Sequence, residues 1–150
     1  MQDRFKFRSY GKPNSIIEGM QNIYTFEEIE GGYFNVKVDK GWLSFVKEED
    51  LKIMQCTGLK DKNGKLIYEG DILDLYVSSK KLYRYEVKYE IGSFMLVSQD
   101  EIFDFPNVWN DNVYPLSQLY YEYQNEEDCI DECEIIGNIY ENPELLKDGE

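Results

Sequence analysis

Apolar and polar residues alternate along much of the chain, and this period of two predicts a protein built mainly of β-strands. The clearest run covers residues 82–89, where Tyr83, Tyr85, Val87 and Tyr89 are expected to share one face of a strand. Many short strands separated by glycine turns are typical of a small antiparallel barrel or a strongly bent sheet. The other predicted strands cover residues 4–8, 33–38, 42–46, 72–77, 94–97, 119–123 and 133–140.

Two stretches carry the signals that start a helix. Thr25 followed three residues later by Glu28 predicts one short helical turn. Near the end, Asn142 is placed to cap a short helix, with Pro143 at its first position and Glu144 favourable to the helix dipole. We therefore expect a mainly β fold, α+β at most, with one or two short helices.

The chain has 150 residues, which predicts a single domain over residues 1–150. A composition of 42% hydrophobic and 15% aromatic residues indicates a folded chain, although the mean hydropathy is only −0.58. No apolar run approaches the length of a membrane-spanning helix, and no apolar segment follows the charged start of the chain. We expect a cytoplasmic protein without membrane contact, containing an irregular loop over residues 98–112.

The chain contains no histidine, so histidine-activated nucleophiles, histidine-ligated metals and histidine pH switches are excluded. The three cysteines, Cys56, Cys129 and Cys133, are an odd number and predict reduced thiols. Cys129 and Cys133 are four residues apart, but a metal held there would need carboxylates to complete its ligands. We predict no catalytic site, cofactor or metal.

The net charge of −14 is concentrated in the last third of the chain, since residues 101–150 carry −13. Such an acidic run is compatible with a solvated loop, a Ca²⁺ site, a catalytic acid pair or a phosphate-like surface for a basic partner. Its order of residues does not match a hand-type Ca²⁺ loop. The candidate acidic interaction surface consists of Glu126, Glu127, Asp128, Asp131, Glu132 and Glu134.

The segment 54–72 is rich in turn signals. Asn63-Gly64 predicts a hairpin with a type I′ turn, in which both residues have positive φ. Gly58 and Gly64-Lys65 do not form a phosphate-binding loop, because five residues intervene instead of four and Leu66 replaces the hydroxyl residue. The candidate turn and capping residues are Gly58, Asn63, Gly64, Glu69, Gly70, Asp71, Gly137, Asn142 and Pro143.

In these segments the chain resembles the YopX family, whose members are encoded mainly by bacteriophages and prophages of Gram-positive bacteria. The resemblance is carried by residues 54–72, by residues 134–146 and by Phe5-Lys6-Phe7-Arg8, with departures at Cys56 and Ser9-Tyr10. It implies one mostly β domain with a barrel-like core, variable middle segments and no assigned enzymatic activity.

We expect an accessory protein that acts by binding rather than by catalysis. Thirteen tyrosines favour self-association into a homo-oligomer, with a phage or host protein as a further partner. The first alternative is an acidic nucleic-acid mimic that binds a basic host protein. The second alternative is nucleic-acid binding through the basic first strand and hairpin, by Arg4, Lys6, Arg8, Lys60, Lys62 and Lys65.

Overall fold

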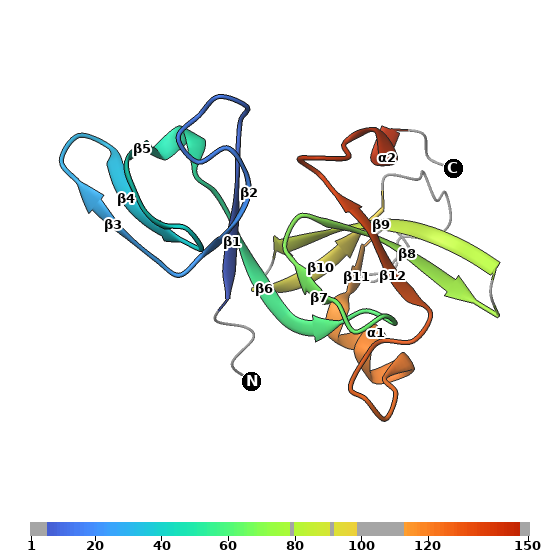
Figure 1. The fold of residues 1–150 in the computed structure, drawn as a ribbon. Helices are drawn as coiled ribbons and strands as arrows, with labels where there is room; N and C mark the ends of the chain where they lie inside the picture. The colour runs from blue at the N-terminus through green and yellow to red at the C-terminus, as the bar shows by residue number, and fades with distance from the viewer. Residues whose placement is uncertain (1–5, 79, 91, 99–112, 148–150) are drawn as a thin grey trace. The chain divides into compact units, whose positions relative to one another are not determined.

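Antiparallel strands dominate the computed structural model, which describes residues 6–78, 80–90, 92–98 and 113–147 (Figure 1). The chain divides into two compact units, unit 1 (Met1–Cys56) and unit 2 (Thr57–Glu150). The predicted fold class is confirmed: the sheets are antiparallel and curled like parts of a barrel, and two short α-helices accompany them. The single domain over residues 1–150 stays a prediction.

Unit 1 contains two antiparallel sheets around one core. β1 (Phe7–Gly11) pairs with β2 (Gly19–Ile23) and with the start of β6 (Lys52–Lys60). β3 (Thr25–Ile29), β4 (Tyr33–Val38) and β5 (Gly41–Lys47) form a three-stranded sheet, which a 3₁₀ turn at Glu48–Asp50 follows. The core residues are Ile17, Ile23, Val36, Val38 and Val46, against which Phe7, Phe34, Leu43 and Leu51 pack.

The helical turn predicted at Thr25–Glu28 is wrong, because these residues belong to β3. All five residues of β3 pair in register with β4, and the Phe26 ring meets the Phe34 ring edge-on at 6.1 Å. A backbone ladder and a cross-strand aromatic pair outweigh a single capping signal, since one isolated helical turn is unfavourable.

Unit 2 contains a five-stranded antiparallel sheet with the order β11-β10-β9-β8-β12. Its strands are β8 (Asp71–Val77), β9 (Lys80–Glu90), β10 (Ser93–Val97), β11 (Val113–Pro115) and β12 (Cys133–Asn138), while β7 (Leu66–Tyr68) follows the end of β6 in a hairpin. The helices are α1 (Leu116–Tyr123) and α2 (Glu144–Lys147). The core residues are Ile67, Leu73, Tyr85, Val87, Leu96, Leu116, Leu119, Ile130 and Cys133.

The strand predicted at 119–123 is also wrong, because this segment forms α1. Leu116, Leu119, Tyr120 and Tyr123 recur at helical spacing, and all four pack on the core of unit 2. The face predicted for β9 is confirmed at Tyr85 and Val87, which are buried, while Tyr89 lies at the exposed end. The irregular segment predicted at 98–112 lies outside the described residues, except for Ser98. Among the described helices, none is both long and apolar enough to cross a membrane.

Candidate binding surfaces

The hairpin between β6 and β7 is fixed by the buried carboxylate of Asp61. Asp61 Oδ1 accepts the backbone N–H groups of Asn63 and Lys65 at 2.9 and 3.0 Å, and Oδ2 accepts that of Ile135 at 3.0 Å. The Gly64 N–H donates to the carbonyl of Asp61, and only Gly64 of the pair has positive φ, at 81°. The type I′ prediction is therefore wrong, since the Asp61 carboxylate supports a longer turn in which Asn63 needs no left-handed backbone.

The same segment contacts β12 at further points, so the two segments that carry the family resemblance meet in space. Asp71 lies opposite Asn138 of β12, and the Gly70 carbonyl accepts the N–H of Ile139, directly after β12, at 2.9 Å. Within the segment, Asp71 Oδ2 accepts the N–H of Tyr68 at 2.7 Å. Asn138 Oδ1 accepts the N–H groups of the next turn, at Tyr140 and Glu141. These bonds give the buried polar groups structural roles.

The side chain of Asn142 bonds backward instead of capping α2 as predicted. Its Oδ1 accepts the N–H of Asn138 at 3.2 Å, and a Cβ added to Gly137 would lie 2.5 Å from that oxygen. Gly137 therefore leaves the space in which Asn142 closes the turn after β12.

A buried ion pair joins the sheet of unit 2 to the end of the chain. Arg84 Nε lies 2.8 Å from Asp74 Oδ1, and Arg84 Nη1 donates to the carbonyl of Leu145 in α2. Asp74 is buried, and the bidentate geometry neutralises it. Asp74 and Arg84 thus connect the sheet to α2, just as Asp61 connects the hairpin to β12.

The acidic stretch forms an ordered loop between α1 and β12. Asn125 Oδ1 accepts the N–H groups of Glu127 and Cys129, the Tyr120 hydroxyl donates to Asp128, and this bond raises the pKa of the Tyr120 hydroxyl. Of the six candidate carboxylates, those of Glu126, Glu127, Asp128 and Asp131 are exposed, while Glu132 and Glu134 are half-buried. Within the described ranges, no three carboxylates or thiols gather as a metal site.

Lys62 already occupies part of this acidic surface. Its Nζ lies 3.9 Å from Glu134 Oε1 and 4.9 Å from the centroid of the Tyr76 ring, in a shallow pocket that Glu132 also lines. Of the other basic residues considered for nucleic-acid binding, Arg4 lies outside the described residues. The rest belong to unit 1 (Lys6, Arg8) or unit 2 (Lys60, Lys65), and nucleic-acid binding stays a prediction.

All three cysteines are buried and free, as thiols rather than disulfides. Burial, reinforced by the charge of Asp61, raises the pKa of the Cys133 thiol to about 12. A thiol with so high a pKa is a poor nucleophile at neutral pH, which fits a packing role.

Unit 1 presents aromatic side chains on the outer face of its three-stranded sheet. Tyr33, Trp42 and Phe45 are 37%, 53% and 62% exposed, whereas the opposite face of β4 carries buried Val36 and Val38. The register pairs Tyr33 with Lys47 and Lys37 with Trp42. Residues directly opposite each other share a face, so the lysines flank the aromatic rings. We call Tyr33, Trp42, Phe45, Lys37 and Lys47 the aromatic face.

Phe45 has a backbone that a bulky residue rarely adopts. Its φ is 59°, at a bulge where the register shifts between Phe34 and Val36, and its ring meets the Tyr33 ring edge-on at 6.2 Å. A non-glycine residue in the left-handed region costs about 1–3 kcal/mol. The strained backbone places the Phe45 ring on the exposed side of the sheet, beside the Tyr33 ring.

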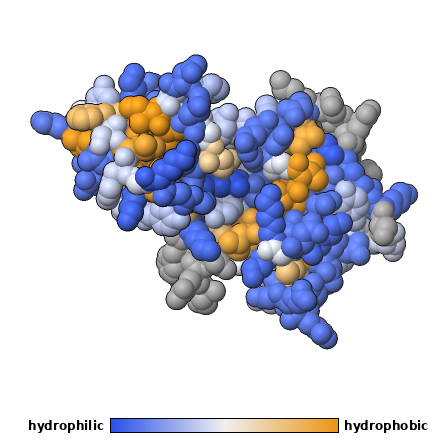
Figure 2. Space-filling view, in the orientation of Figure 1, coloured by the Kyte–Doolittle hydropathy of each residue, from blue (hydrophilic) through white to orange (hydrophobic). Residues whose placement is uncertain are grey.

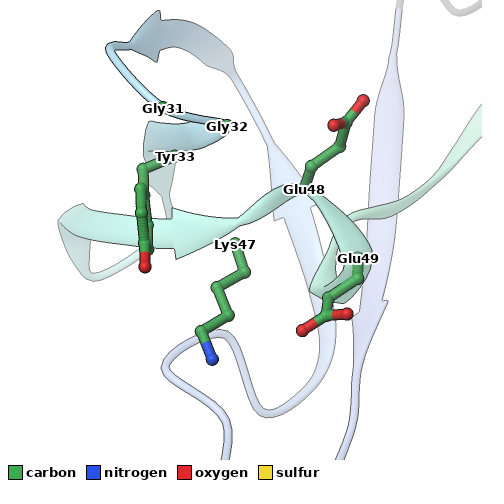
Figure 3. A pocket seen from close by; sticks show the side chains of 6 residues that line it. All are labelled: Gly31, Gly32, Tyr33, Lys47, Glu48 and Glu49. Carbon is green, nitrogen blue, oxygen red and sulfur yellow. The ribbon is translucent and has the colours of Figure 1, made fainter.

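A shallow pocket adjoins this face at the end of the β4–β5 ladder. It is lined by Gly31, Gly32, Tyr33, Lys47, Glu48 and Glu49. In Figure 3 the side chains of Tyr33, Lys47 and Glu49 extend to one side of β5, and that of Glu48 extends to the other. In Figure 2 hydrophobic residues reach the visible surface of unit 1 beside strongly polar ones. The pocket lining combines the ring of Tyr33 with charges of both signs, from Lys47 and from Glu48 and Glu49.

Comparison with known proteins places the chain in a family. The model of the family described as YopX protein matches residues 6–147. The chain belongs to the YopX family. Among solved structures, YopX from Bacillus subtilis has a TM-score of 0.53 at 18% identity, covering 95% of this chain and 98% of that chain, which shows a shared fold.

Protein EF1440 from Enterococcus faecalis is 28% identical with a TM-score of 0.46, covering 94% of this chain and 96% of that one. No curated protein matches the chain.

The sequence interpretation of this YopX-family chain missed the aromatic face. The signal was present in part: Tyr33 and Lys37 alternate with the apolar residues of the same strand, which already places them on the outer side. The bulge that turns Phe45 onto that side left no mark in the sequence, because phenylalanine is not a residue that favours positive φ.

Proposed function

We propose that this YopX-family protein acts by binding rather than by catalysis, as a phage or prophage accessory protein of the bacterial cytoplasm that self-associates through the aromatic face. The observation that supports it most is the exposure of Phe45 and Trp42 beside Tyr33. Large exposed aromatic patches with a charged rim are typical of protein interfaces. The phage setting rests on the family resemblance alone.

The nearly balanced charge of unit 1 is compatible with a second copy of unit 1 as the partner of the aromatic face. Unit 1 carries nine acidic and eight basic side chains, a net charge of −1, whereas unit 2 carries −13. The outer face carries charges of both signs. Glu27 of β3 lies opposite Asn35 of β4, while Lys37 belongs to β4 and Lys47 to β5. A two-fold arrangement can therefore set a glutamate of one copy against a lysine of the other.

The strand order supports the same partner. β3 and β5 are the edges of the three-stranded sheet, and four of the five residues of β3 are exposed. An exposed edge strand is a template for pairing with another chain. Burying it against a second copy would protect both the edge and the neighbouring rings.

Sedimentation equilibrium of the full chain, from low to high micromolar concentration, tests the proposal. We expect a mass that is a multiple of 17.8 kDa for the native chain and a monomer for Trp42→Ser/Phe45→Asn. Ile16→Ser is the matched control, since Ile16 is 54% exposed in unit 1 outside this sheet, and it should leave the mass unchanged.

A native monomer at all concentrations would contradict self-association. Salt-sensitive binding of single-stranded DNA that Trp42→Ser/Phe45→Asn abolishes would instead assign the aromatic face to nucleic acid, because rings beside lysines can also stack bases.

The second candidate function is the acidic nucleic-acid mimic, which the ordered loop favours. Asn125 holds the backbone of this loop while Glu126 and Glu127 remain exposed, so their charges keep a defined spacing. Such a surface would bind the basic groove of a host protein in a salt-sensitive manner.

Capture from host lysate at low and high salt tests this candidate. A basic nucleic-acid-binding protein should bind the native chain at low salt only. It should not bind the variant in which Glu126, Glu127, Asp128, Asp131, Glu132 and Glu134 are neutralised to the amides, and undiminished capture by that variant would contradict the mimic.

A further inference from the structure

Unit 2 contains a half-enclosed pocket where α1 packs against the five-stranded sheet. Four tyrosines line it, Tyr83 and Tyr85 from β9, Tyr114 from β11 and Tyr123 from α1, together with three leucines and Glu122. Among the described residues that line it, none is a lysine or arginine. We call it the tyrosine pocket.

Glu122 gives this pocket a fixed negative charge. Its Oε1 accepts the Tyr114 hydroxyl at 2.7 Å and Gln118 Nε2 at 2.9 Å. These two bonds lower the pKa of Glu122, so the carboxylate is ionised at neutral pH. Among the described residues, none donates a hydrogen bond to Oε2, and Glu122 is exposed. One carboxylate oxygen beside the rings is therefore available to a ligand.

The chain itself shows which group such an arrangement holds. At the acidic loop, the Lys62 ammonium lies over the Tyr76 ring and beside Glu134, so a tyrosine and a glutamate together accept a cation. The tyrosine pocket offers the same two groups with more rings and without a lysine. An ammonium or guanidinium group is attracted both to the ring faces and to the carboxylate.

We propose that the tyrosine pocket receives a lysine or arginine side chain of a basic protein partner. The charge of −13 on unit 2 draws such a partner towards this unit over longer distances. The pocket belongs to unit 2 and lies outside the aromatic face, so the proposal does not depend on self-association. Both this proposal and the nucleic-acid mimic involve a basic partner. Here, however, Glu122 and the tyrosine rings recognise the partner, instead of the acidic loop.

NMR titration of the ¹⁵N-labelled full chain tests the proposal with two capped tripeptides as probes, acetyl-Gly-Lys-Gly-amide and its norleucine counterpart. We expect the lysine peptide to shift the amide signals of Tyr83, Tyr114 and Tyr123 in a saturable manner. The norleucine peptide, which has the same carbon chain without the charge, should bind at least tenfold more weakly.

Two variants separate the pocket from the acidic loop. Glu122→Gln should weaken binding of the lysine peptide about tenfold, whereas Glu126→Gln, which removes the same charge from the exposed loop, should change it less than twofold. Tyr123→Leu should also weaken binding while the amide spectrum stays dispersed. Equal binding of both peptides, or shifts confined to residues 126–134 and lost equally in both glutamate variants, would overturn the proposal.

Discussion

Unit 1 and unit 2 use polar and apolar residues in opposite ways. Unit 2 buries carboxylates, with Asp61, Asp71 and Asp74 at 1–3% exposure, and bonds Asp61 and Asp71 to backbone N–H groups and Asp74 to Arg84. Unit 1 instead exposes aromatic rings and holds Phe45 in a strained backbone. Buried polar networks specify a fold, whereas exposed rings specify a contact. This difference underlies our proposal that the buried carboxylates of unit 2 maintain the structure while unit 1 provides the interface.

The strongest test of this comparison is Asp61→Asn in unit 2. The new amide group would place a donor where one carboxylate oxygen now accepts a buried backbone N–H. Loss of charge-assisted bonds and an unsatisfied buried donor should lower the free energy of unfolding by about 4 kcal/mol, measured by urea unfolding.

Asp131→Asn is the matched control, because Asp131 is exposed and accepts a single side-chain bond from Asn125, and it should cost less than about 1 kcal/mol. Equal losses for the two variants would show that Asp61 is not the residue that holds the hairpin to β12.

Two glycine substitutions, one in each unit, compare how much an added methyl group lowers the free energy of unfolding. A Cβ added to Gly11 would lie 1.9 Å from the carbonyl oxygen of Ile17, so Gly11→Ala must displace backbone and should cost about 3 kcal/mol. In unit 2, Gly137→Ala meets the movable side chain of Asn142 and should cost about 1–2 kcal/mol. Urea unfolding of both variants checks the order, and a larger loss for Gly137→Ala would reverse it.

Sequence patterns predicted most strands and the positions of the turns, because alternation and glycine report directly on local backbone. They failed where one local signal competed with packing. The tyrosines of 119–123 favoured a strand, although Leu116, Leu119 and Tyr123 already had helical spacing. The partners of Asp61 could not be predicted, since Ile135 is 74 residues away in the chain.

A smaller effect is expected from Glu86, a buried carboxylate of β9. Burial raises its pKa above 4.5, the nearby charge of Glu90 adds to this, and Lys88 opposes it. The folded state therefore keeps this proton to a higher pH than the unfolded chain, so stability contributed by protonated Glu86 is full below pH 4.5 and is lost as the pH rises through the raised pKa.

Glu86→Gln should remove that loss and stabilise the chain at pH 7 by on the order of 1 kcal/mol, with the two stability curves converging below pH 4.5. Glu126→Gln, at an exposed position, should leave the pH dependence unchanged. Thermal unfolding across pH 4–8 measures both, and a destabilised Glu86→Gln at pH 7 would mean that the carboxylate has a favourable partner.

The most direct test of self-association through unit 1 is hydrogen–deuterium exchange of the native chain at low and high micromolar concentration. We expect amides of β3, β4 and β5 to become slower to exchange as concentration rises, while amides of β8, β9 and β12 keep their rates. Concentration-dependent protection confined to unit 2, or none in either unit, would contradict the account.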